Sequence, residues 1–71
     1  MNSRINGNFL ELEITRDDFE QAPHYPFTNF TERFIRDTLT QVGFKLDCEI
    51  IREYKPDRDI ILFKQKIENN R

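Results

Sequence analysis

The sequence predicts a small α+β domain of order strand–helix–strand–strand, on three observations. One segment near the N-terminus alternates between apolar and polar residues, and a central segment has apolar residues at helical spacing. Two further alternating segments flank a proline-containing turn near the C-terminus. Because the chain has 71 residues, we expect a single domain over residues 1–71. The expected elements are a strand at about 8–15, a loop at 16–27, a helix at about 28–42, a strand at about 44–54, a turn at 55–58 and a strand at about 59–67.

The first predicted strand follows the turn-forming pair Asn6-Gly7. Its apolar residues Leu10, Leu12 and Ile14 fall on one face, and acidic residues alternate with them on the other. Period-two alternation of this kind is typical of a half-buried strand. In the loop that follows, Thr15 and Asp18 have the spacing of a capping box, which would support one short helical turn.

The predicted helix begins at Thr28 or Asn29, because Asn29 and Glu32 have capping-box spacing. It ends at Gly43, since glycine is the residue favoured just past a helix end. Its apolar residues occupy about half of the circumference, which is wider than the stripe that one sheet face requires. We therefore expect this helix to have apolar surface to spare at its edges, one of which carries Leu39.

Opposite charges indicate a register for the C-terminal hairpin. With Lys55-Pro56-Asp57-Arg58 as the turn, Tyr54 would stand opposite Asp59, and Ile51 opposite Leu62. The same register would place Cys48 on the core face. It would also form three opposite-charge pairs, which are Glu49 with Lys64, Asp47 with Lys66, and Lys45 with Glu68.

The last strand is apolar on both faces near the turn, which is typical of a central strand. We therefore predict a mixed three-stranded sheet of spatial order 1-3-2, with the helix packed on one face. The first strand would run antiparallel to the third and parallel to the second, through a right-handed crossover. The alternative order, 1-2-3, would leave the doubly apolar strand at an edge.

Composition argues against several classes of function. Cys48 is the single cysteine, so no disulfide can form within the chain, and a reducing, cytoplasmic location is expected. No apolar run reaches the roughly 18 residues of a membrane helix. The 11 basic residues against 13 acidic ones give a net charge of −2, without the basic excess of nucleic-acid binders. No phosphate-binding glycine-rich loop is present, so we expect neither an enzyme nor a cofactor.

A protein-interaction module is the function that this reasoning favours. A chain this short buries a small core and benefits from a partner, either a second copy or a larger protein that it serves as an accessory or inhibitory subunit. The expected interface is an apolar patch on the sheet face away from the helix. That patch comprises Phe9, Ile51, Ile60 and Leu62, and a second candidate surface comprises Phe19, His24 and Tyr25.

Two alternatives stay open. The first is a small nucleic-acid-binding regulator that contacts phosphates with Arg52, Lys55 and Arg58 at the hairpin end, although acidic residues are interleaved with them. The second is a metal-assisted activity at Asp17, Asp18 and His24, which lack a recognised ligand spacing. Because that spacing is missing, our prediction is no metal site, and the metal-assisted activity is kept only as a remote alternative.

Overall fold

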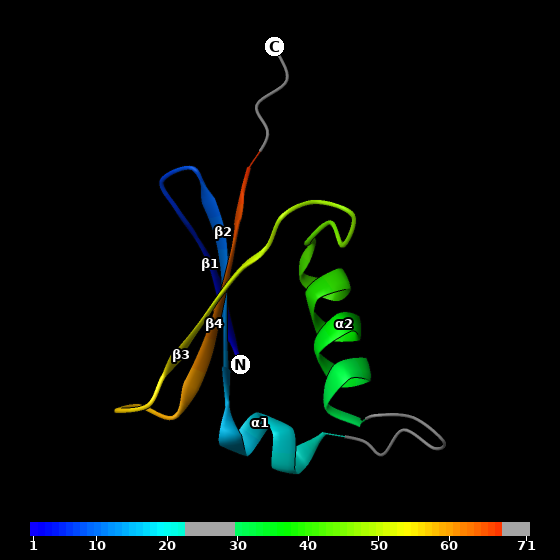
Figure 1. The fold of residues 1–71 in the computed structure, drawn as a ribbon, viewed down its shortest axis with the longest axis vertical. Helices are drawn as coiled ribbons and strands as arrows, with labels where there is room; N and C mark the ends of the chain where they lie inside the picture. Colours follow the sequence, from blue (N-terminus) through cyan, green and yellow to red (C-terminus); the bar gives the residue numbers. More distant parts are fainter. Residues whose placement is uncertain (23–29, 68–71) are drawn as a thin grey trace.

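The computed structural model describes residues 1–22 and 30–67 as four strands and two helices (Figure 1). The strands lie together, α2 stands along one side of them, and α1 lies across one end. This arrangement confirms the predicted α+β class, with one strand and one helix more than predicted. The elements are β1 (Asn2–Asn6), β2 (Phe9–Thr15), α1 (Arg16–Gln21), α2 (Phe30–Val42), β3 (Ile51–Lys55) and β4 (Ile60–Lys66).

The four strands form one sheet of order β1-β2-β4-β3, in which every neighbouring pair is antiparallel. The three predicted strands therefore have the predicted order, with the last strand between the other two. The description of the sheet as mixed was wrong, because β2 and β3 run parallel but β4 separates them.

The sequence pattern did not indicate β1. Its five residues are all exposed and include one apolar side chain, so they show no alternation. The strand forms because the chain reverses through Gly7 and Asn8, and Asn6 then faces Phe9. Gly7 has a φ of 62°, a conformation that costs glycine little and other residues more. β1 thus becomes one outer strand of the sheet.

The hairpin register predicted from the charges was wrong by two residues. The predicted turn does form, with the Arg58 N–H donating to the Lys55 carbonyl at 3.2 Å. Asp59, however, has a φ of 53° and belongs to the loop, so Lys55 faces Ile60. A shift of two residues keeps the side chains of β3 and β4 on their predicted faces.

The new register removes the direct partners that the prediction proposed. Ile51 faces Lys64, and Leu62 faces Glu53. The predicted pairs of Glu49 with Lys64 and of Asp47 with Lys66 are not cross-strand pairs, because β3 begins only at Ile51 and Lys64 faces Ile51. Glu68, the predicted partner of Lys45, lies outside the described residues. Cys48 is exposed in the turn that precedes β3, so its predicted place on the core face was also wrong.

The core lies between α2 and the sheet. Phe19 of α1 closes one end, where its ring meets Phe34 edge-on at a centroid separation of 5.1 Å. The short helical turn expected after Thr15 is confirmed as α1, because Thr15 and Asp18 form a complete capping box. The buried apolar cluster comprises Leu12, Ile14, Phe34, Ile35, Leu39, Phe44 and Phe63.

Candidate functional site

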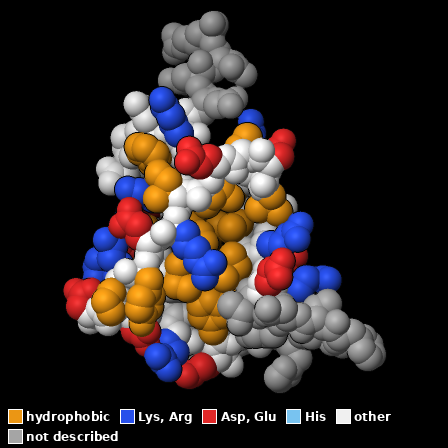
Figure 2. Space-filling view, in the orientation of Figure 1, with side chains coloured by type: hydrophobic (Ala, Val, Ile, Leu, Met, Phe, Trp, Pro, Cys, Tyr) orange, Lys and Arg blue, Asp and Glu red, His pale blue; other side chains and the backbone are white. Residues whose placement is uncertain are grey.

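An apolar groove lies between α2 and β3. Figure 2 shows hydrophobic side chains exposed in a hollow between these two elements, with positively charged side chains across and beside them. The groove has a volume of about 590 Å³. Its apolar lining is the half-buried Ile50 together with Ile35, Leu39 and Phe63, which belong to the buried core and are only 8%, 4% and 3% exposed. Its charged lining is Glu32, Arg36 and Arg52.

The groove exists because one helix is too narrow for this sheet. Four strands at about 4.8 Å spacing place the outer strands roughly 14 Å apart, whereas a helix with its side chains is about 10 Å wide. Among the described residues, the buried core cluster draws on α2, β2, β4 and Phe44 but on no residue of β3. β3 therefore extends beyond the part of the sheet that α2 covers.

Gln65 positions the segment that leads into β3. This side chain is 8% exposed and lies on the α2 side of the central strand β4. The Lys45 N–H donates to Gln65 Oε1 at 2.8 Å, and Gln65 Nε2 donates to the Lys45 carbonyl at 2.7 Å. Nε2 also lies 3.4 Å from the Glu49 carbonyl. These bonds hold residues 45–49 on the sheet and so place Ile50 at the groove.

Two arginines bring positive charge to the groove. Arg52, the second residue of β3, places its guanidinium 5.8 Å from the centre of the Phe63 ring. Within residues 1–22 and 30–67, Arg52 forms no ion pair with an acidic side chain. Arg36, on α2, approaches Glu32 at 3.9 Å, and both side chains are well exposed. Two cations thus line the groove against one acid.

A small polar network closes one end of β3. The Tyr54 hydroxyl donates to Asp59 Oδ1 at 3.1 Å, and Arg16 Nε donates to Asp59 Oδ2. The hydrogen bond from Arg16, and then that from Tyr54, lowers the pKa of Asp59. The same contact with Asp59 raises the pKa of Tyr54. The network connects the β3–β4 loop to α1, so the C-terminal end of β3 is held in place by side-chain bonds.

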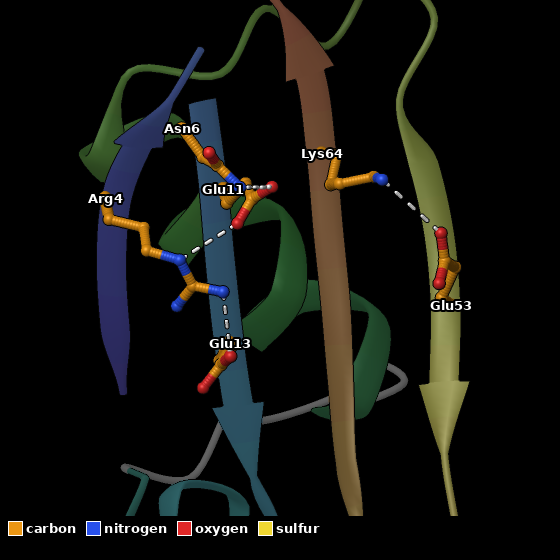
Figure 3. Close-up of polar contacts among 6 residues, drawn as sticks. All are labelled: Arg4, Asn6, Glu11, Glu13, Glu53 and Lys64. Carbon is orange, nitrogen blue, oxygen red and sulfur yellow. Dashed lines mark hydrogen bonds and ion pairs between the residues drawn. The ribbon is translucent and has the colours of Figure 1, made fainter. Parts of the chain in front are cut away.

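The opposite face of the sheet is covered largely by ion pairs (Figure 3). Arg4 binds Glu11 at 2.9 Å and Glu13 at 3.0 Å, and Glu11 is only 5% exposed. On the other side of the face, Glu53 binds Lys55 at 3.0 Å and Lys64 at 3.6 Å. Hydrogen bonding to Lys55, with further attraction from Lys64, lowers the pKa of Glu53.

The predicted interface residues all lie on this charged face. Ile60 is 6% exposed, Phe9 and Leu62 are half-buried, and Ile51 is 38% exposed. The Lys64 ammonium lies 5.5 Å from the centre of the Phe9 ring. Phe9 and Ile51 line a hollow of about 610 Å³ that also contains several charged side chains. The patch stays a prediction, but its apolar members are interrupted by charge.

The structure does not bring the basic residues of the nucleic-acid alternative onto one surface. Arg52 lies on the α2 side of β3, whereas Lys55 lies on the opposite face and binds Glu53. Arg58 belongs to the turn between β3 and β4.

The remaining candidate residues belong to the predicted second surface and to the metal alternative. Phe19 packs into the core, so it contributes little to a second surface. His24 and Tyr25 lie outside the described residues. Asp17 and Asp18 lie in the first turn of α1, and no group of three potential metal ligands occurs among the described residues.

The sequence prediction missed the groove. Spare apolar surface was expected at the Leu39 edge of α2, but Leu39 is 4% exposed and belongs to the buried cluster. Comparison of the chain with protein-family models, with curated proteins and with solved structures finds no match. In the described part of the chain, no helix is long and apolar enough to cross a membrane.

Proposed function

We propose that this protein is a non-enzymatic protein-interaction module that binds an extended segment of a partner protein by strand addition at β3. The observation that carries the proposal is the apolar groove of about 590 Å³ beside an outer strand of the sheet. The module would serve as an accessory or inhibitory subunit of the larger protein that supplies the segment.

An outer strand offers main-chain groups for pairing. Alternate residues of such a strand direct their N–H and C=O groups away from the sheet, where another strand can bind them. A segment added to β3 would lie about 4.8 Å beyond it, next to the space that α2 leaves uncovered. Every second side chain of the segment would then point toward the groove, whose half-buried apolar residue is Ile50. Main-chain pairing would give affinity, and the groove would give selectivity.

The expected affinity is modest. Burying one aliphatic side chain contributes about 1.5–3 kcal/mol, and each main-chain hydrogen bond adds about 1 kcal/mol net. Loss of translational and conformational freedom opposes these gains. Because β3 has five residues, the strand can form only a few such bonds. A dissociation constant of about micromolar order is therefore expected.

Site-specific photocrosslinking tests the proposal without disturbing the core. A photoreactive phenylalanine analogue replaces Tyr54, which is 58% exposed on β3, or Ile5, which is 71% exposed on β1, the other outer strand. Each protein is illuminated in a lysate, and the attached peptide is identified by mass spectrometry. Adducts of one extended segment from position 54, with none from position 5, are the expected result.

Three results would contradict the proposal. Equal labelling from the two positions would show that β3 is not the preferred edge. Labelling from position 5 alone would move the interface to β1. A position-54 adduct that contains this chain's own β3 would identify a second copy as the occupant, and light scattering on the purified protein would then show a dimer.

A further inference from the structure

We infer that the groove selects segments that carry an acidic side chain two positions from an aliphatic one, and that Arg36 and Arg52 bind the acid. The inference rests on the proposed strand addition at β3 and adds the chemistry of the partner.

The geometry places the arginines where an added strand would meet them. Arg52 and Tyr54 are the β3 residues on the α2 side, and a residue opposite Arg52 would have its Cβ about 5 Å away. Arg36 reaches the same groove from α2. A carboxylate on the added strand would therefore lie between two guanidinium groups, one on each wall.

Local charge favours an acid at this position. Among described residues, Arg52 has the Phe63 ring as its neighbour and no carboxylate. Stacking on an aromatic ring restricts the guanidinium while its N–H groups stay available for a bidentate bond. Among the described residues that line the groove, Glu32 is the single acid against two arginines, so this lining is positive although the whole chain has a net charge of −2. A lysine at the same position would meet two like charges.

The apolar part of the groove sets the second requirement. Side chains of an extended segment return to the same face every second residue. When the acid lies beside Arg52, the side chain two positions away would lie beside Ile50, which is two residues before Arg52 and half-buried in the groove lining. An aliphatic side chain fits this lining, so the expected ligand reads acid–any residue–aliphatic, or the reverse.

A displayed library of random ten-residue peptides, selected on three immobilised proteins, tests the inference. The proteins are wild type, Arg52→Glu and the matched control Arg58→Glu, which makes the same charge change in the exposed turn. Wild type and Arg58→Glu should enrich the same acidic–aliphatic motif. Arg52→Glu should enrich a basic residue at the acidic position. Fluorescence anisotropy with the enriched wild-type peptide should show about tenfold weaker binding to Arg52→Glu, about 1.4 kcal/mol.

Different outcomes of this experiment test the acidic selectivity and the strand addition at β3. Enrichment of apolar peptides with no acid, or an unchanged motif on Arg52→Glu, would overturn the acidic selectivity and leave strand addition standing. No enrichment on folded wild type would overturn both. Arg36→Gln provides a second variant, and it should weaken the acidic preference without reversing it. Thermal melts that match wild type within a few degrees would show that the variants are folded.

Discussion

Replacing Gln65 by methionine should destabilise the protein strongly, although methionine has a similar volume and is apolar. In the structure the Gln65 amide bonds both main-chain groups of Lys45, at 2.8 and 2.7 Å, and approaches the Glu49 carbonyl at 3.4 Å. No neighbouring strand takes this role, because β3 begins only at Ile51. The side chain thus replaces sheet pairing for the segment that crosses from α2 to β3.

The size of the effect follows from these bonds. Each short bond contributes about 1 kcal/mol net, and a group that stays buried after losing its partner costs more. The long third contact adds little. Because methionine fills most of the space, a cavity contributes little as well. The expected loss in free energy of unfolding is about 2–3 kcal/mol, out of roughly 4–10 kcal/mol for a domain of this length.

Urea unfolding followed by circular dichroism measures the loss, and thermal unfolding should show a melting temperature about 10–20 °C lower. The matched control is Gln41→Met on α2, where the glutamine is exposed and the same change should alter stability by less than about 0.5 kcal/mol. Equal stability of the two variants would refute the role assigned to Gln65.

Two further predictions concern pH and helix capping. Arg16 lowers the pKa of Asp59 in the folded protein. A carboxylate of this kind stabilises the folded state at pH values above its unfolded pKa, and this stabilisation is lost as the pH falls through its folded pKa. The urea midpoint should therefore fall as the pH drops below about 4, less steeply in Asp59→Asn, and a midpoint that rises in acid would contradict this. Thr15→Val removes the hydroxyl that accepts from the Asp18 N–H at 3.2 Å and should cost about 1 kcal/mol by urea unfolding. Thr40→Val, on the exposed side of α2, is the control, and an equal loss in both would exclude a capping effect.

Several parts of the fold were predictable because their signals are local. Alternating residues mark β2, helical spacing marks α2, and the capping box of Thr15 and Asp18 marks the start of α1. The central place of β4 was also predictable, since Ile60, Ile61 and Leu62 are apolar on both faces of that strand. Each of these inferences needs only the composition and period of one segment.

Other parts depended on contacts between distant residues. β1 has no alternation of apolar and polar residues, and it forms by pairing with β2. Arg4 of β1 binds Glu11 and Glu13 on that neighbouring strand. The hairpin register depended on the left-handed conformation of Asp59, which lengthens the loop beyond the turn that the proline marks. A charge pattern alone supported the wrong register, because exposed ion pairs contribute too little to outweigh the loop geometry.

By itself, the sequence determined the class of fold and the order of the three alternating strands. The tertiary structure alone decided which part of the sheet α2 leaves uncovered. The Gln65 amide bonds the main chain of Lys45, so residues 45–49 form a loop on the sheet and not the strand that was predicted there. The helix α2 packs over β2 and β4. Together these contacts leave the groove beside β3. The physical reason is that periodicity records which face of a segment is buried, whereas the uncovered edge depends on how a helix of fixed width is placed on a wider sheet.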